Sequence, residues 1–439
     1  MATDSGTPLK LSNAAVLPLR TLDPATPLDD LEWLDEAIGD ARVVAIGETA
    51  HGIREFYQLR HRLLRYLVER HGFDAYAMES GFVEGWAVNE WVHGGGDELS
   101  QVLATGITFL MGLVSPMRSH LEWMRDHNRD AAGPVSFYGV DVPGSYLSLL
   151  PGIDAVIAYL GQADPAFDVD PNIRETAAAW AGNSTRVPTT FAAYKNLIPA
   201  ARNTLTAGLA QLAARMTARR LSYCEQTGIA AYERALQSLR VTVNLDAAIR
   251  EQTRDPQSET GIRDASMAQT VEWIADRHDR IVVAAHNGHI QRWPLSVAGV
   301  PGFTPMGMHL ADRLGDDYRV IGTTCGTGRI VTADPDIDAG KLYTDFEAPE
   351  TGSLDAVMAA SHDGPFAVDL RRLSPADAAT LQGVSQQRLA HLYCDTIPLG
   401  AFDVAVHLPH ISLADPDVNA VAHAPDDVQQ ALRHAAPDA

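Results

Sequence analysis

Four short apolar segments, far apart in the chain, each run directly into ionisable side chains. They are residues 43–47 before Glu48 and His51, 75–78 before Glu79, 135–140 before Asp141, and 281–285 before His286 and His289. Apolar runs of this length between helical patterns are typical of buried strands in a parallel sheet. Ligands bind beyond the carboxyl ends of such strands, so the charged side chains are expected to converge in one cleft. This convergence predicts an enzyme.

The order of the patterns predicts an α/β fold with a central, mostly parallel sheet and helices on both faces. Residues 1–164 form the N-terminal α/β half in this interpretation, and residues 256–410 form the C-terminal half. Between them, residues 165–255 are rich in Ala, Leu and Arg with helical periodicity, which predicts an inserted helical cap subdomain. The composition of residues 411–439 predicts a mobile tail.

Composition narrows the partners. The 439 residues carry 34 basic against 56 acidic side chains, a formal net charge of −22, which argues against nucleic acid or anionic membrane as a partner. No segment is long and apolar enough to span a membrane, and residues 1–19 lack the pattern of a secretory signal. The three cysteines, widely spaced and without a CxxC pair, indicate free thiols in a reducing cytoplasm. The sequence leaves the oligomeric state open.

Residues 47–52, Gly-Glu-Thr-Ala-His-Gly, connect the first predicted strand to a helix. The flanking glycines permit a tight turn, and a histidine beside a carboxylate is a usable general base. The alternative is a polar connection in which Thr49 caps the helix. Glu79 is compatible with holding His51 or sharing a proton with Glu48, but taken alone its position favours a surface residue that opens the next loop.

Arg60 lies on the apolar side of the predicted helix that follows. The apolar stripe consists of Phe56, Leu59, Leu63, Leu64 and Leu67, and the solvated side of Gln58, Arg62, Arg65 and Glu69. A guanidinium is costly to bury unless a carboxylate pairs with it, so Glu48 and Glu79 are its expected partners. The alternative is that the long side chain extends to the rim.

Residues 286–289, His-Asn-Gly-His, close the fourth strand. Two histidines three residues apart are suited to bind metal, hydrogen-bond an oxyanion or relay protons, although a turn with incidental histidines is the alternative. Arg263 and Asp264 begin a predicted helix over residues 262–276. We expect them to form an ion pair that fastens this helix rather than to take part in catalysis.

Several familiar motifs are missing. The chain has no GxSxG, no HExxH, no Walker loop and no GxGxxG between a strand and a helix. Hydrolysis would therefore require water as the nucleophile, and no cofactor is expected. A metal site built from the Glu and His residues is a further hypothesis, against which the nearby arginine counts because it repels a cation.

The motifs also occur together in an order that resembles the erythromycin esterase family, from about residue 35 to 330. They are residues 47–52, Glu55-Phe56, Arg60, 73–79, 137–141, Arg263-Asp264 with Met267, and 286–289. The resemblance implies a mostly parallel sheet, a helical subdomain beside the cleft, and hydrolysis of a macrolide lactone by water. It implies that His51 is the general base, that Glu48 and Glu79 support it, and that Arg60, His286 and His289 bind substrate and stabilise the oxyanion.

The predicted catalytic residues are thus His51, Glu48, Glu79, Arg60 and His286, and the predicted substrate-binding residues are His289, Asp141 and Arg263. The expected partner is a small-molecule substrate that is large and mostly apolar. An alternative function is that of a biosynthetic enzyme, a cyclase, dehydratase or acyl transferase, which uses the same acid-base cluster on a natural-product intermediate.

Overall fold

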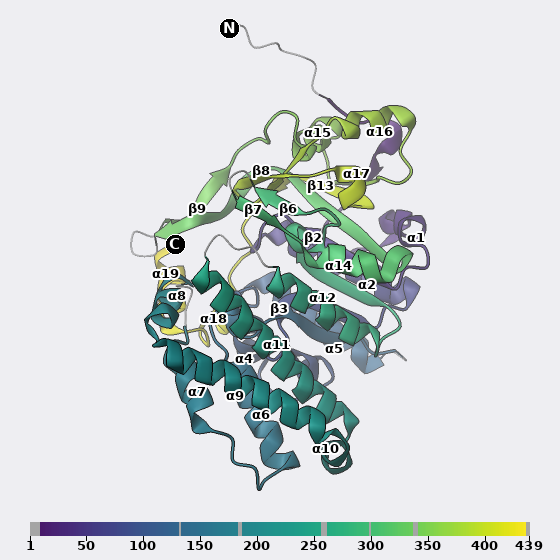
Figure 1. Cartoon of the computed structure of the whole chain (residues 1–439). Coiled ribbons are helices and arrows are strands. Elements are labelled where there is room, and N and C mark those ends of the chain that lie inside the picture. The colour runs from purple at the N-terminus through teal and green to yellow at the C-terminus, as the bar shows by residue number, and fades with distance from the viewer. Residues whose placement is uncertain are drawn as a thin grey trace.

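The computed structural model describes residues 9–130, 133–182, 187–255, 261–297, 300–336 and 341–435. Its centre is a nine-stranded sheet in the order β1-β10-β13-β8-β2-β5-β3-β4, with β9 paired to β8 (Figure 1). The strands are β1 (Leu17–Pro18), β2 (Val43–Glu48), β3 (Ala75–Gly81), β4 (Ser136–Asp141), β5 (Ile281–His286), β8 (Tyr318–Asp336), β9 (Lys341–Phe346), β10 (Phe366–Asp369) and β13 (Val404–Ile411).

The six strands from β13 to β4 are parallel to their neighbours, and β1, β10 and β9 pair in the antiparallel sense. This confirms the predicted mostly parallel sheet. Glu48 at the end of β2 lies in register with His286 at the end of β5. The parallel arrangement therefore gathers the predicted site residues at one edge of the sheet.

Alternate residues of the central strands enter two separate cores, because successive side chains of a strand point to opposite faces. Val44 and Ile46 pack into the core that includes α2 (Arg54–His71) and α5 (Ser115–Asp130). Val43 and Ala45 pack into the core that includes α12 (Ile262–Ala275), α14 (Met306–Leu314) and α15 (Leu354–Ser361). The predicted helices on both faces are thereby confirmed.

Shorter elements complete the sheet layers. A second, antiparallel sheet has the order β11-β12-β6-β7, with β6 (Leu295–Val297), β7 (Val300–Phe303), β11 (Gln386–Leu389) and β12 (Leu392–Asp395). The remaining short helices are α1 (Trp33–Ile38), α3 (Gly85–Val92), α4 (Leu99–Gly106), α13 (Asn287–Ile290), α16 (Pro375–Gln382), α17 (Pro398–Ala401) and the 3-10 turns η1 (Asn13–Ala15), η2 (Asp29–Leu31), η3 (Gly144–Tyr146) and η4 (Gly315–Asp317).

Six helices form a lobe at one end of the molecule (Figure 1). They are α6 (Leu150–Ala163), α7 (Pro171–Ala178), α8 (Val187–Asn196), α9 (Pro199–Ala218), α10 (Arg220–Thr227) and α11 (Ile229–Arg254). The lobe has its own apolar core, which includes Ile153, Leu209 and Leu245. The region predicted to be helical is helical in its described part, and α6 extends the lobe towards the N-terminus.

Two parts of the chain that were expected to be exposed to solvent pack against the rest of the protein. Residues 411–435 form α18 (Val418–Val421) and α19 (Asp426–Ala435), and Ala420 and Val428 belong to the main core, so this part is not the mobile tail that its composition predicted. Arg62, expected on the solvated side of α2, is fully buried. The segment before α1 covers it, and Arg62 donates to Asp30 there.

None of the helices in the described ranges combines the length and hydropathy that crossing a membrane requires.

Candidate active site

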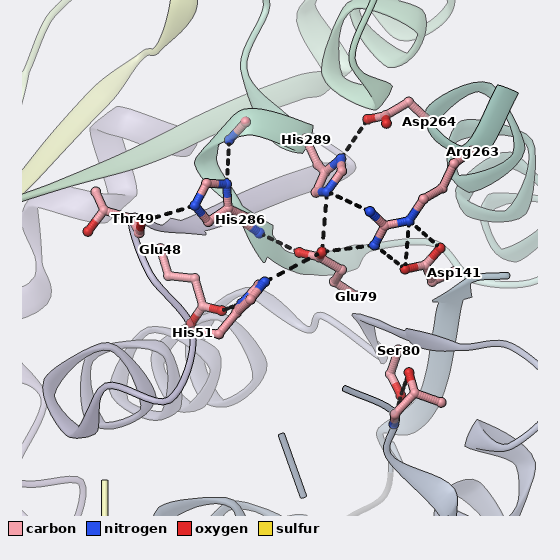
Figure 2. Close-up of polar contacts among 12 residues, drawn as sticks. Glu48, Thr49, His51, Glu79, Ser80, Asp141, Arg263, Asp264, His286 and His289 are labelled. Atoms are coloured by element: carbon pink, nitrogen blue, oxygen red, sulfur yellow. Dashed lines mark hydrogen bonds and ion pairs between the residues drawn. The ribbon is translucent and has the colours of Figure 1, made fainter. Parts of the chain in front are cut away.

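Glu79 lies at the centre of a polar cluster where the parallel strands end (Figure 2). Its Oε2 accepts a hydrogen bond from the backbone N–H of His286 at 2.7 Å. Its Oε1 lies 3.2 Å from Nη2 of Arg263, 3.3 Å from Nε2 of His289 and 3.9 Å from Nε2 of His51. Burial alone would raise the pKa of Glu79, but His289, His51 and Arg263 outweigh it and hold the pKa well below its ordinary value. Glu79 is thus an ionised, buried carboxylate and not a surface residue.

His51 and Glu48 form a directly hydrogen-bonded pair. Nδ1 of His51 lies 2.6 Å from Oε1 of Glu48. An ionised carboxylate only accepts, so Nδ1 donates and the neutral imidazole keeps its basic lone pair on Nε2. Burial disfavours the charged imidazole, yet the Glu79 charge and the bond to Glu48 together raise the pKa of His51.

Arg60 is buried, and its Nη1 lies 3.4 Å from Oε2 of Glu48. Its guanidinium also lies 4.8 Å from the ring centre of Tyr57. Of the two expected partners of Arg60, Glu48 is confirmed, whereas Glu79 pairs with Arg263 and His289. The alternative position of Arg60 at the rim is wrong. Burial opposes the charge of Glu48, but Arg60 and then His51 lower the pKa of this carboxyl on balance.

His286 is held as a neutral imidazole. The backbone N–H of Gly288 donates to Nδ1 of His286 at 3.2 Å, which assigns the ring proton to Nε2. Nε2 then donates to the carbonyl oxygen of Thr49 at 3.0 Å. Burial, and after it the nearby charge of His51, lower the pKa of His286 to about 4. The side chain therefore fastens the loop that carries His51.

His289 is held in the opposite charge state. Nδ1 lies 2.7 Å from Oδ1 of Asp264, and Nε2 faces Glu79. Burial works against the charge, but Asp264 and Glu79 raise the pKa of His289 to about 10. Two carboxylates on opposite sides of one ring favour the doubly protonated imidazolium.

Arg263 binds Asp141 through two nitrogens, Nε at 3.0 Å from Oδ1 and Nη2 at 2.5 Å from Oδ2. Asp264, its neighbour in the chain, instead binds His289 and accepts from the backbone N–H of Met306 at 2.9 Å. The expected ion pair that fastens the helix is therefore wrong in both partners. Both residues belong to the polar cluster.

The eight predicted site residues lie in this cluster, and sequence reasoning missed several of their supports. Asp264 was assigned a different partner, and Thr49 contributes its backbone oxygen, which no side-chain motif reveals. Tyr57 stacks on Arg60 from the preceding helical turn. A polar residue such as Asp264, close to the apolar positions of a helix, is the signal that such a role leaves in the sequence.

The arrangement of the Glu, Asp and His side chains in the cluster decides whether it is suited to bind a metal ion. Among the described residues, no group of three or more His, Cys, Asp or Glu side chains has an arrangement suited to a metal ion. Each carboxylate of the cluster already pairs with a cationic or hydrogen-bonding group, and two arginines, the buried Arg60 and the partly exposed Arg263, lie beside them. A guanidinium repels a cation and competes for the same oxygens.

The cluster opens to solvent at His51. The side chain of His51 is 42% exposed, while those of Glu48 and Glu79 are buried. A separate pocket of about 470 Å³ lies between α2 and α5, and its lining includes Arg54, Gln58, His61, Ser119 and Trp123 but none of the eight cluster residues. Of the polar cluster, His51 is the side chain most available to an incoming molecule.

Known proteins resemble most of this chain. The family model described as Erythromycin esterase matches residues 68–411. Erythromycin esterase type II of Escherichia coli is 31% identical over 366 residues, which cover 78% of this chain and 84% of that protein. Erythromycin esterase type I of Escherichia coli is 29% identical over 321 residues, which cover 70% and 75%.

Among solved structures, a mutant of the erythromycin esterase EreC in its open conformation shares the fold. The TM-score is 0.74 at 22% identity, and the alignment covers 90% of this chain and 97% of that one. The central sheet and its flanking helices are therefore an arrangement that occurs in solved structures.

Proposed function

The chain belongs to the erythromycin esterase family, and from this membership we propose that it hydrolyses the lactone ester of a macrolide-type natural product with water activated by His51. Membership makes the chain a carboxylic ester hydrolase. The observation that carries the finer proposal is the bond from His51 to Glu48, which leaves a basic, exposed nitrogen beside the buried Glu79.

In the first step His51 takes a proton from water. Nε2 of the neutral ring accepts this proton as the water oxygen attacks the ester carbonyl carbon. The imidazolium that forms lies between Glu48 and Glu79, so both carboxylates stabilise the positive charge that develops. This arrangement lowers the free energy of the transition state more than that of the resting enzyme.

The charge that appears on the carbonyl oxygen needs hydrogen-bond donors. Arg263 supplies a cationic N–H group at Nη1 on the other side of Glu79, and the positive ring of His289 lies beside it, with Nε2 3.4 Å from Nη1. Fixed donors of this kind stabilise an oxyanion without rearranging. His51 then returns its proton to the departing alkoxide, so that ester and water yield one acid and one alcohol.

The other cluster residues act through these groups. His286 positions the loop of His51 through the Thr49 carbonyl, and Arg60 keeps Glu48 ionised. Asp141 fixes the guanidinium of Arg263. We therefore assign His286 and Asp141 as positioning residues, and Glu48 as the residue that orients the base.

The biosynthetic alternative has less support. Neither the matching family model nor the two Escherichia coli relatives carry a cyclase, dehydratase or acyl transferase name.

Incubation of the purified protein with erythromycin, followed by mass spectrometry, tests the proposal. We expect a ring-opened acid, heavier than the substrate by one water. His51→Gln keeps a donor towards Glu48 but removes the base, so kcat should fall on the order of 10²–10⁴-fold with the fold intact. His423, 38% exposed and 4.0 Å from Glu98, gives the control His423→Gln, which should leave kcat unchanged. Full activity of His51→Gln would overturn the role of His51.

A further inference from the structure

Strained backbone is concentrated around the polar cluster. In the described part of the chain, five residues other than glycine have a left-handed backbone: Phe109 (φ 57°), Leu110 (φ 61°), Ser145 (φ 52°), Tyr146 (φ 68°) and Ala390 (φ 48°). Residues with a Cβ avoid this region, and such conformations persist where surrounding contacts enforce them, often at ligand sites. All five lie in three loops that contact the cluster or its supports.

The first loop is fixed by strand β3 and helix α2. The backbone N–H of Thr108 donates to Oγ of Ser80 at 2.9 Å, and the Tyr57 hydroxyl donates to the carbonyl of Met111 at 3.1 Å. Between these anchors, the ring of Phe109 lies 5.3 Å from the guanidinium carbon of Arg263. Phe109 therefore stands directly beside the group that binds Asp141 and Glu79.

The second loop follows strand β4 and joins the first. Its Gly144 N–H donates to Oε1 of Glu84 at 2.6 Å, and Oγ of Ser145 accepts from the backbone N–H of Phe109 at 3.0 Å. The Tyr146 ring lies 6.0 Å from that of Phe191 in the helical lobe. The two loops are thus one connected structure between the polar cluster and the lobe.

Apolar side chains of these loops remain open to solvent. Leu110 is 40% exposed, and Phe109 and Tyr146 are half-buried. The third loop differs, because Ala390 donates to the Thr49 carbonyl at 2.7 Å and presents only a methyl group. An exposed leucine and two half-buried aromatic rings leave apolar surface in contact with water beside the polar cluster, and contact with an apolar ligand would remove that surface from water.

We propose that Phe109, Leu110 and Tyr146 form an apolar recognition surface that binds the hydrocarbon face of a large lactone ring and gives the enzyme its preference for macrocyclic over small esters. This inference rests on the proposed function. Phe109 lies beside Arg263, so a ring held on this surface would bring its ester towards Glu79 and His51. The long hydrocarbon edge of a macrocycle would cover Leu110, which a small acyl ester is too short to reach.

Leu110→Gly distinguishes a role in substrate contact from a role in stability. Glycine adopts the left-handed backbone without strain, while the side chain that would contact the substrate is removed. We expect a higher Tm together with a Kd for erythromycin about tenfold weaker, measured by calorimetry. The kcat/KM for erythromycin, relative to that for the small ester p-nitrophenyl acetate, should fall by a similar factor. A residue with a merely structural role would not combine higher stability with weaker binding.

Two control variants test whether relief of strain, or loss of any exposed leucine, gives the same result. Ala390→Gly relieves the same kind of strain without removing a contact surface, so Tm should rise while the Kd stays unchanged. Leu221→Ala removes an 80% exposed leucine from helix α10 in the lobe and should change neither quantity.

The outcomes distinguish the two proposals. A Kd for Leu110→Gly within twofold of the wild type overturns the recognition surface even if the wild type hydrolyses erythromycin. Absence of erythromycin binding by the wild type overturns it as well. Tight binding that Leu110→Gly weakens, without any hydrolysis, supports the recognition surface and overturns only the proposed function.

Discussion

Nδ1 of His51 lies 2.6 Å from Oε1 of Glu48, three residues earlier in the chain, and this one contact sets both the orientation and the tautomer of the ring. The turn after β2 returns His51 to the end of its own strand. Oε2 of Glu48 pairs with the guanidinium of Arg60, so the carboxylate stays ionised while its other oxygen binds the imidazole. The pair is therefore built before any substrate arrives.

Glu48→Gln should change the pH dependence of hydrolysis. Burial lowers the pKa of His51, and the Glu79 charge and the Glu48 bond together raise it on balance above 6.5. Removal of one carboxylate lowers it again, and the neutral ring is the active form. The rising limb of kcat/KM against pH should therefore move to lower pH, while the plateau falls on the order of 10²-fold.

The control for this variant is Glu98→Gln, which makes the same chemical change at an exposed position. It should leave the profile in place. If Glu48→Gln moved the rising limb to higher pH, Glu48 would not be the group that raises the pKa of His51.

His289→Gln should change how stability depends on pH. The folded-state pKa of His289 is about 10, above the ordinary 6.5, because Asp264 and Glu79 outweigh the effect of burial. A group with a raised folded-state pKa contributes its stability below pH 6.5 and loses it as the pH rises through about 10. The difference in unfolding free energy between wild type and His289→Gln should be largest below pH 6.5 and shrink towards pH 10.

Urea unfolding at several pH values measures this difference. A difference that stays constant from pH 6 to pH 10, or grows with pH, would show that His289 is neutral in the folded protein.

Asp417→Ala should destabilise the fold. Asp417 caps helix α18 by accepting from the backbone N–H of Ala420 at 2.8 Å, and it also pairs with Arg118 of α5. Loss of an N-cap typically costs about 1 kcal/mol, and loss of the ion pair with Arg118 adds to this. Asp415→Ala, two residues earlier at a side chain 72% exposed, should change the free energy of unfolding by less than about 0.5 kcal/mol. If both variants changed the free energy of unfolding by the same amount, the contacts of Asp417 with α18 and α5 would not stabilise the fold.

Apolar runs were sufficient to locate the main strands, because a strand buried on both faces needs an uninterrupted run such as residues 281–285. They did not indicate which strands become neighbours. They also failed where a distant segment covers a side chain, as for Arg62, or where small residues such as Ala420 complete a core. Periodicity records which residues are apolar but not which surface packs on them.

The site was predictable where a local pattern was violated. Arg60 interrupts an apolar stripe, and this conflict correctly indicated a carboxylate partner. Arg263 and Asp264 are adjacent in sequence, which suggested that they pair with each other. The structure instead directs Arg263 to Asp141 and Asp264 to His289, because residues next to each other on a helix point in different directions.

Hydrolysis of erythromycin in water enriched in ¹⁸O tests the central claim most directly. Water activated by His51 attacks the ester carbonyl, so mass spectrometry should find one ¹⁸O in the new carboxylate of the product and none in the released hydroxyl. His51→Gln should lose this labelled product. A wild-type product without solvent oxygen in its carboxylate would contradict the account, because the nucleophile would then not be water.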